Sequence, residues 1–587
     1  MSNSVPPVKR WRVQTSISSG VRAALCAYDP VLAQVLYNRG QDTPEKARMF
    51  LEGGDHALHS PFLMRGMSEA VARIQRAIKQ DELIAIYGDF DADGVTSTAL
   101  LTSVLRGLGG RVHPYIPNRV DEGYGLNADA LDRLKDIGVR LVVTVDCGIR
   151  SVEEVAYGRR IGLDMIVTDH HSVGEELPDA LAVIDPKVDA RLREEDGMTG
   201  WYPEDMLAGV GVAYKLADAL LRAEEAQTSR RPDFKLEDLL DLVALGTVAD
   251  LAPLDRLENR ELVRRGLEVL NRAQRAGVYE LTQVSGVEPG KIDTTAIGFM
   301  LAPRINAPGR LGSAMIAYDL LMADQPGAGA LALQLQGLNE RRQALTQEAV
   351  EIARARALGE AAVELPLIFD AGPEYMSGIV GLVAGRLCEE FYRPAVVIEQ
   401  ADGESRGSCR SIPDFDITRA LDECADLLVR HGGHSQAAGF TVRNENIPLL
   451  HERLAGIAAR KLSGQDLRPE LHIDAEVSLD VLTMDLAHAL QQLEPTGVGN
   501  RAPLFAVRGL RVADSRRVGR EGRHLRLRLT DGAHWMDAIA FKQGDWAERM
   551  PAGVDVAFHL EVNEWNGSSR LQLNVQDLRQ SGDDLDD

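Results

Sequence analysis

The sequence predicts an α/β protein of several domains that ends in a β-barrel, and three observations carry this prediction. The chain has 587 residues, enough for about four domains of roughly 150 residues each. Short apolar runs alternate with helical periods from Leu83 to Asp169, and again from about Leu365 to Arg460. After about Leu471 the apolar residues recur with period two, which is typical of half-buried strands.

The first alternating stretch indicates a mainly parallel sheet covered by helices. Its expected strands are LIAIYG, RVHPYI, VRLVVTVD and LDMIVTD. Helices are expected over Thr96 to Leu108, near Ala128 to Ile137 and near Val152 to Ile161. Ligands of such sheets gather at the carboxyl ends of the strands, so we expect the functional site at that edge.

The later elements follow from similar patterns. The stretch from Ala328 onward is rich in alanine and polar helix formers, which predicts one long helix that connects two domains. The segment HLRLRL (524–529) places its leucines on one strand face and Arg526 and Arg528 on the other, and Asn566-Gly567 predicts a hairpin turn. The expected divisions are an N-terminal segment (1–50), a first α/β domain (51–325), a connecting helix (326–360), a smaller α/β domain (361–465), a β domain (466–580) and an acidic tail (581–587).

The composition is that of an ordinary folded protein. Hydrophobic residues make up 45% of the chain and charged residues 26%, which argues against extensive disorder. No apolar run is long enough to span a membrane and no leader precedes the first domain, so we expect a cytoplasmic protein without a membrane partner. The five cysteines are dispersed and include no C-x-x-C, so a metal site would use oxygen and imidazole ligands.

Charge is distributed unevenly along the chain. The net charge of -23, from 65 basic and 88 acidic residues, argues at first sight against a polyanionic partner. However, the stretch from Arg501 to Arg528 contains nine arginines and only two acidic residues, Asp514 and Glu521. Either this cluster binds a polyanion or it is a solvated strand face, and its own sequence leaves both interpretations open.

Three carboxylates follow the first expected strand directly. Asp89, Asp91 and Asp93 stand at alternate positions where the strand opens into a loop before a helix. Such crowding raises the pKa of each carboxyl unless a cation compensates, so a divalent metal is one explanation. A calcium loop of the EF-hand type fits poorly, because position twelve is Leu100 rather than glutamate and the flank is a strand. A solvated acidic turn remains the other alternative.

Two more of the expected strands end in potential ligands. Asp146 follows VVTV, the segment Asp169-His170-His171 follows MIVT, and Asp250 follows a further apolar run. Taken singly, such an acid is commonly a helix cap and such a histidine a packed residue. Carboxylates with imidazole and no thiolate suit Mn²⁺ or Mg²⁺ better than structural zinc.

Seven motifs, in this order and spacing, resemble those of the DHH phosphoesterases, and within them the RecJ-type single-strand-specific exonucleases. They are YGDFDADGVTS (87–97), TVDCGI (144–149), TDHH (168–171), GTVADLAPL (246–254), RINAPGRLG (304–312), SCRSI (408–412) and GGHSQAAGF (432–440). The resemblance implies a DHH domain, a DHHA1-type domain and an OB-like barrel. It also implies a 5′-to-3′ single-stranded-DNA exonuclease that releases 5′-mononucleotides in DNA repair and recombination.

The resemblance implies the roles of the acidic residues. Two divalent ions, Mn²⁺ or Mg²⁺, would be bridged by Asp146, while His171 faces the scissile phosphate and Asp169 positions its neighbours. The remaining ligands would be Asp89 and Asp91 on one ion, and Asp93, His170 and Asp250 on the other.

The resemblance also implies how the DNA is held. Arg119, Ser408 and Arg410 would bind the 5′-terminal phosphate, and Tyr124 offers a stacking face for an unpaired base. Further contacts to the strand would come from Arg304, Asn306, Arg310, the turn at His434 and, in the barrel, Arg526 and Arg528 with Trp535, Phe541 or Trp565 nearby.

Two alternatives stay open. A DHH phosphodiesterase of short oligoribonucleotides or cyclic dinucleotides would share the acidic motifs, although it would not need the terminal β domain. A non-catalytic replication scaffold would share the fold without the complete ligand set. By analogy with the family we expect a monomer that works with a single-strand-binding protein and a helicase.

Overall fold

The computed structural model describes residues 8–119, 122–123, 125–196, 201–227, 234–359, 365–565 and 568–582. These fall into two compact units, one built from Leu58–Leu467 and the other from Pro7–Ala57 together with Arg468–Asp587. None of the helices in the described residues combines the length and the hydropathy needed to cross a membrane.

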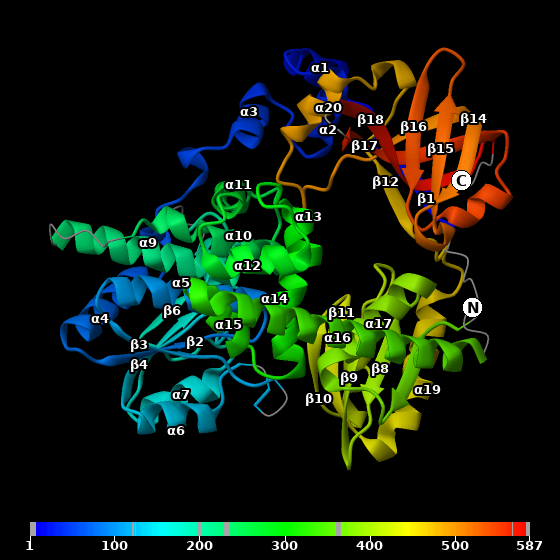
Figure 1. Ribbon diagram of the computed structural model, residues 1–587. Coiled ribbons are helices and arrows are strands. Elements are labelled where there is room, and N and C mark those ends of the chain that lie inside the picture. Colours follow the sequence, from blue (N-terminus) through cyan, green and yellow to red (C-terminus); the bar gives the residue numbers. More distant parts are fainter. Residues whose placement is uncertain are drawn as a thin grey trace. The chain divides into compact units, whose positions relative to one another are not determined.

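A five-stranded, wholly parallel sheet forms the centre of the first unit (Figure 1). Its order is β3-β2-β4-β5-β6. The strands are β2 (Leu83–Tyr87), β3 (Arg111–Tyr115), β4 (Val139–Thr144), β5 (Asp164–Thr168) and β6 (Ala182–Ile184). Alternate residues feed two cores, because Ile84 and Ile86 pack with one set of helices while Ala85 and Tyr87 pack with another. Burial on both faces explains why these strands are continuous apolar runs.

Helices cover both faces of this sheet and extend it. Helices α4 (Met67–Lys79), α5 (Ala92–Gly107) and α9 (Gly209–Gln227) contribute to the first core, and α6 (Ala128–Asp136) and α7 (Val152–Arg160) to the second. Further helices of this unit before the connector are α8 (Pro186–Asp196), α10 (Leu240–Ala249), α11 (Leu257–Asn271), α12 (Ala276–Ser285), α13 (Thr294–Ala296), a π-helix (Ile297–Leu301), α14 (Ala302–Leu311) and α15 (Met315–Met322).

Helix α16 (Gln325–Gly359) is the expected connector and has 35 residues. Near its start Ala328, Ala332 and Leu335 are buried in the core of the parallel sheet. Further along, Val350 and Ala353 are buried in a separate core that belongs to the second sheet. One helix therefore supplies apolar residues to two cores, which accounts for its mostly polar remainder.

The second sheet of this unit is mixed, with the order β10-β11-β9-β8-β7. Only β7 and β8 are parallel, and the other three pairs are antiparallel. Its strands are β7 (Ile368–Gly372), β8 (Ala395–Glu399), β9 (Glu404–Arg410), β10 (Leu428–His434) and β11 (Ala437–Arg443), with helices α17 (Ser377–Phe391), α18 (Ile417–Asp422) and α19 (Ile447–Leu462).

The second unit is a closed five-stranded barrel. Its strands pair in the order β14-β15-β16-β18-β17, and β17 returns to β14. The bounds are β14 (Phe505–Val518), β15 (His524–Thr530), β16 (Trp535–Ala540), β17 (Gly553–Trp565) and β18 (Ser568–Gln580), with β13 (Ala475–Glu476) and α20 (Met484–Gln491) before them. The three leucines of β15 point inward and are buried, as period two predicts. The expected turn at Asn566-Gly567 lies outside the described residues.

The N-terminal segment belongs to this barrel unit. Strand β1 (Arg10–Val13) pairs in parallel with β12 (Glu470–Ile473). The Trp11 side chain is buried against Ile473 and donates from Nε1 to Asp577 Oδ2 at 2.7 Å. Helices α1 (Ser19–Ala24), α2 (Pro30–Asn38) and α3 (Pro44–Glu52) follow. Together the parallel sheet, the connecting helix, the smaller α/β sheet and the terminal barrel confirm the predicted fold class.

Candidate metal centre and phosphate pocket

The loop after β2 places three carboxylates at the start of α5. Asp91 is the N-cap of that helix, and its Oδ1 accepts hydrogen bonds from the backbone N–H groups of Asp93 and Gly94 at 3.0 and 3.1 Å. The Asn306 side chain accepts from the backbone N–H of Ala92 at 2.7 Å. The loop is thus held by the Asp91 cap and by Asn306 of α14, and these contacts orient the Asp91 carboxylate.

Asp146 follows β4 in a left-handed backbone conformation, with φ near 60°. Non-glycine residues seldom adopt this region, and Asp146 is also almost fully buried. Gly209 at the start of α9 lies directly against it, since a Cβ there would come within 2.7 Å of the Asp146 Cβ. Only glycine therefore lets α9 approach this carboxylate.

The same helix terminus holds Asp93. The backbone N–H groups of Gly209 and Val210 donate to the two oxygens of the Asp93 carboxylate at 2.6 and 2.8 Å. Helix N-termini stabilise negative charge, so α9 partly compensates a buried anion. Our sequence reasoning missed Gly209, whose signal is the LAGVGV stretch (207–212) at the start of an apolar helix.

The segment after β5 presents both imidazoles. Asp169 Oδ1 accepts from the backbone N–H groups of His170 and His171 and lies 2.7 Å from His171 Nδ1, while its Oδ2 accepts from Ile149 N–H at 2.9 Å. Lys187 Nζ donates to the His170 carbonyl. Asp169 thus orients the His171 ring, while contacts from Ile149 and Lys187 hold Asp169 and the His170 backbone in place.

His170 points into the acidic cluster. Its Nε2 lies 3.0 Å from Asp146 Oδ1, 3.7 Å from Asp250 Oδ2 and 3.8 Å from Asp93 Oδ2. The structure thus brings together all the predicted metal ligands, which form three overlapping groups of close donor atoms. These are Asp89, Asp91 and Asp146; Asp93, His170 and Asp250; and Asp146, Asp169, His170 and His171.

Burial perturbs the ionisation of this cluster. It raises the pKa of Asp89, Asp93 and Asp146 well above the usual range, and repulsion between the carboxylates raises them further. Burial and then the Asp91 charge raise the pKa of Asp250 to about 7. Without a metal, burial and repulsion therefore favour the protonated form of these carboxyls. A bound cation would displace those protons.

The two histidines differ in charge. Burial, with the charge of His171, lowers the pKa of His170 to about 3, so its imidazole is neutral and can act as a ligand. Burial also opposes the charging of His171, but its hydrogen bond and ion pair with Asp169 raise its pKa to about 9. His171 is therefore a cation beside the cluster.

Three buried atoms show that the donor set fits metal ions. Among the described residues Asp89 Oδ1, Asp146 Oδ1 and His170 Nε2 form no hydrogen bond, although the last two atoms lie 3.0 Å apart. A buried lone pair without a partner costs free energy, and a divalent ion satisfies it. Carboxylate and imidazole donors without thiolate suit Mn²⁺ or Mg²⁺.

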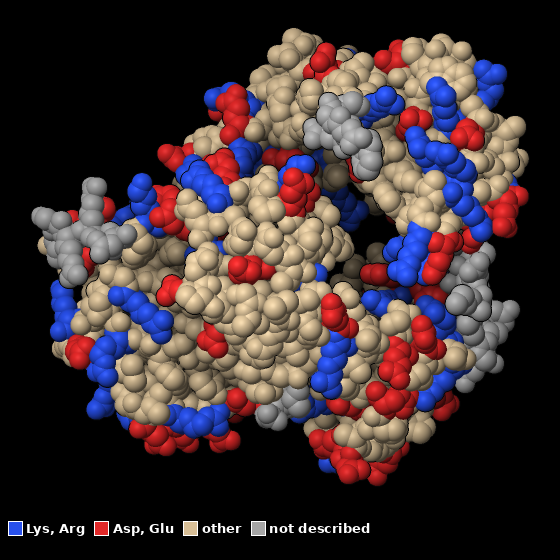
Figure 2. Space-filling model, in the orientation of Figure 1, with Lys and Arg blue, Asp and Glu red and all other residues tan. Residues whose placement is uncertain are grey.

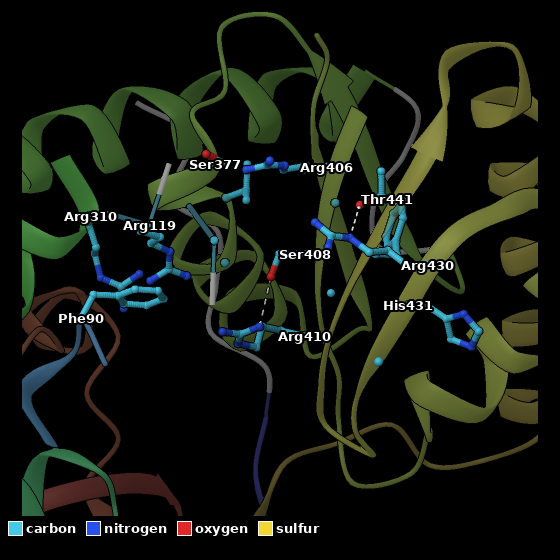
Figure 3. Close-up of a pocket in the computed structure, with 17 residues that line it drawn as sticks. Phe90, Arg119, Arg310, Ser377, Arg406, Ser408, Arg410, Arg430, His431 and Thr441 are labelled. Carbon is cyan, nitrogen blue, oxygen red and sulfur yellow. Dashed lines mark hydrogen bonds between the residues drawn. The ribbon is translucent and has the colours of Figure 1, made fainter. Parts of the chain in front are cut away.

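A cationic pocket of about 570 Å³ lies between the two sheets of the first unit. Figure 3 shows Arg119 and Arg310 beside Phe90, and Ser408 and Arg410 projecting from the second sheet. The Arg119 guanidinium carbon stands 4.7 Å from the centre of the Phe90 ring, and Arg410 donates to Ser408 Oγ at 3.2 Å. The described lining contains five arginines and one histidine but no carboxylate, so it is suited to an anion.

The other predicted contact residues lie elsewhere. Arg304 donates to the Gln336 side chain at 2.7 Å and does not line the pocket, and Asn306 supports α5. His434 is exposed at the end of β10, and its carbonyl accepts from Thr418. Tyr124 lies outside the described residues. Lining residues that we missed are Arg406, Arg430 and His431, which no motif marks.

On the barrel, Arg526 and Arg528 point outward from β15 and are exposed. The Arg528 guanidinium lies 5.0 Å from the centre of the Trp535 ring, and both Trp535 and Phe541 are more than half exposed. Figure 2 shows basic side chains gathered over β14 and β15. Exposed aromatic rings beside arginines form a surface on which bases can stack.

Comparisons with known proteins agree with this architecture. Three family models match: "DHH family, N-terminal domain" over residues 83–247, "DHHA1 domain" over 364–459 and "RecJ OB domain" over 473–577. The chain is 39% identical to the single-stranded-DNA-specific exonuclease RecJ of Bacillus subtilis (strain 168), over 97% of this chain and 70% of that protein.

Two crystal structures of RecJ from Thermus thermophilus resemble the whole chain. The complex with Mn²⁺ has a TM-score of 0.82 at 34% identity and covers 97% of this chain and 79% of that one. The complex with Mg²⁺ has a TM-score of 0.76 at 32% identity, with 97% and 78% covered. Both ions are those that the donor set favours. With its matching domains and sequence, the chain belongs to the RecJ family of DHH phosphoesterases.

Proposed function

We propose that this protein is a single-stranded-DNA-specific exonuclease that digests DNA from its 5′ end with two divalent ions, in DNA repair and recombination. The observation that carries the proposal is the cluster of buried, partnerless donor atoms on Asp89, Asp146 and His170 in a unit that also holds a carboxylate-free arginine pocket. Its relatives are named as exonucleases of this kind, and two of their structures contain Mn²⁺ or Mg²⁺.

The side chains have distinct tasks in the proposed hydrolysis. Asp146 and His170 each belong to two of the three donor groups. Of these two, only Asp146 has two oxygens with which to reach two ions, which supports its role as the bridging ligand. When bound, two divalent ions polarise the scissile phosphate and acidify a water. His171, oriented by Asp169, would donate a hydrogen bond to the developing negative charge on that phosphate.

The arginine pocket sets the direction of digestion. A 5′-terminal phosphate binds to Arg119, Ser408 and Arg410. Arg310 lines the same pocket and adds a further positive charge. A strand anchored there by its 5′ phosphate presents its first internucleotide phosphate to the metal centre, so the product is a 5′-mononucleotide. Arg526 and Arg528 bind more distant phosphates, while Arg304, Asn306, Tyr124 and His434 stay predictions as strand contacts.

Product mapping tests the proposal against its nearest rival. A 5′-phosphorylated single strand, labelled at either end, should yield labelled mononucleotides at once from a 5′ label and only late from a 3′ label, with Mn²⁺ or Mg²⁺ supplied. Asp146→Asn is the matched inactive control. Cleavage of cyclic or linear dinucleotides without cleavage of the long strand would favour the phosphodiesterase alternative. Intact DNA binding without hydrolysis would favour the scaffold.

The proposal extends to the cellular location, oligomeric state and partners of the enzyme. Because single-stranded DNA arises during repair and recombination, we propose that the enzyme acts in the cytoplasm as a monomer, next to a single-strand-binding protein and a helicase. Light scattering of the purified chain measures its oligomeric state, and co-purification measures the partners. We also propose the domain divisions at 50, 325, 360, 465 and 580, which limited proteolysis would test.

A further inference from the structure

The pocket face of the second sheet carries a regular ladder of side chains. In the strand register, Arg406 of β9 is opposite Thr441 of β11, which is opposite Arg430 of β10. Two residues along β9, Ser408 is opposite Gly439, which is opposite Gly432. Successive rungs on one face are about 6.6 Å apart, because each strand residue rises about 3.3 Å. The backbone of Arg406 is therefore about 13 Å along the strand from that of Arg410, with the Ser408 rung between them.

The middle rung has no side chains except Ser408. Neither Gly432 nor Gly439 has a left-handed φ, so the backbone does not require glycine at either position. A Cβ on Gly432 would meet nothing within 4 Å, and one on Gly439 would meet only the Gly407 carbonyl at 3.7 Å. These glycines leave an open floor that leads from Ser408 to the Arg406 rung.

The arginines of the far rung lack acidic partners. Among the described residues neither Arg406 nor Arg430 forms an ion pair, and Arg430 makes one side-chain hydrogen bond, to Thr441 Oγ1 at 3.2 Å. Both line the pocket, and Figure 3 shows them projecting from the second sheet. Several other arginines of this unit, such as Arg354 with Glu390, are neutralised by carboxylates. The far rung therefore presents two free cationic groups inside a pocket that is already suited to anions.

We propose that Arg406, Arg430 and Thr441 form a second phosphate-binding subsite, so that the pocket binds an extended polyphosphate rather than a single phosphate. The first phosphate occupies Ser408 and Arg410, the chain crosses the glycine floor, and the outer phosphates bind the Arg406 rung. The assignment of the first position rests on the proposed function. Two sources share this chemistry: a 5′-triphosphate end of a strand, and free polyphosphate such as a nucleoside triphosphate, which would act as an inhibitor.

Binding can be measured without catalysis. Calorimetry of the full chain in EDTA, with inorganic tripolyphosphate and orthophosphate as probes, should show that tripolyphosphate binds at least about tenfold more tightly, as expected for an added charge-assisted contact. The double variant Arg406→Gln/Arg430→Gln should remove most of this ratio, and Arg406→Lys should keep part of it. Arg443→Gln is the matched control, because Arg443 lies on the same strand face outside the pocket. Circular dichroism establishes that each variant is folded.

Cleavage assays then distinguish the two possible ligands, the 5′-triphosphate end of a strand and free polyphosphate. If strands with 5′-triphosphate ends are degraded as well as those with monophosphate ends, and the double variant selectively loses the former, the strand end is the ligand. If free tripolyphosphate inhibits while triphosphate-ended strands are degraded no better than hydroxyl-ended ones, free polyphosphate is the ligand. Equal binding of both probes by the wild type, or an unchanged ratio in the double variant, overturns the subsite. Because the calorimetry contains no metal or DNA, it gives this result even if the nuclease proposal fails.

Discussion

The metal centre and the arginine pocket belong to the same unit, yet they solve opposite electrostatic problems. At the metal centre the carboxylates are buried and repel one another, and three donor atoms lack partners among the described residues. In the pocket the like charges are positive: burial, and then repulsion from Arg119 among others, lowers the pKa of Arg310 to about 10. The first region therefore favours cations and the second favours anions. A bound ligand of opposite charge should stabilise either region, because it binds the folded state.

The largest effect is expected from Asp146→Asn. This substitution removes the carboxylate shared by two donor groups, so hydrolysis should fall by about three orders of magnitude or more, because metal ions supply several kcal/mol of charge stabilisation in the transition state. The metal-free variant should melt no lower than the wild type, since asparagine is neutral, as is the carboxyl whose ionisation burial and repulsion oppose. Single-turnover cleavage and thermal melting in EDTA measure the two quantities. Substantial turnover would refute the bridging role.

Substitution in the pocket should change selectivity more than stability. Arg410→Ala should lower the preference for 5′-phosphorylated over 5′-hydroxyl strands by roughly 10- to 100-fold, as expected for a lost hydrogen bond to a charged group. The ratio of kcat/KM for the two strands measures this preference, and Arg443→Ala is the control. An unchanged ratio in Arg410→Ala would remove this pocket from recognition of the 5′ end.

The pH dependence of stability tests whether protons and metal ions compete for the carboxylates of the metal centre. Asp250 has a pKa of about 7 in the metal-free fold against 3.8 ordinarily, so its contribution to stability is complete below pH 4 and is lost as the pH rises through 7. Mn²⁺ binds the deprotonated carboxylates, so its stabilising effect should be larger at about pH 8 than at about pH 6. Melting temperatures with EDTA and with Mn²⁺ at both values test this. An equal increase in melting temperature with Mn²⁺ at both pH values would contradict competition between protons and metal ions.

The smallest effect is expected on the barrel. The double variant Arg526→Gln/Arg528→Gln should weaken binding of single-stranded DNA several-fold and lower the slope of log affinity against log salt by about 1.4, because each phosphate contact to a single strand contributes about 0.7. A titration at several salt concentrations gives the slope, with Arg272→Gln at the C-cap of α11 as the control. No change in slope would exclude this face of the barrel from the DNA site.

Three of the predicted metal ligands share one property: each stands where a strand of the parallel sheet ends. Asp89, Asp146 and His170 follow three different strands, and parallel strands deliver their carboxyl ends to one edge. Motifs on a helix and on antiparallel strands had mixed outcomes. Arg310 and Arg410 line the pocket, whereas Arg304 and His434 do not. Such motifs do not by themselves say which way a side chain points.

The sequence by itself determined the alternation of strands and helices, the period-two barrel strands and the donor types of the metal site, because all of these follow from local apolar periodicity and side-chain chemistry. Only the tertiary structure decided that Gly209 packs against Asp146, that Arg406 and Arg430 share a rung, and that the N-terminal strand pairs with Glu470–Ile473. Each of these contacts joins segments distant in the chain, and hydrogen bonding between strands and close packing of glycine leave no local pattern that identifies the partner.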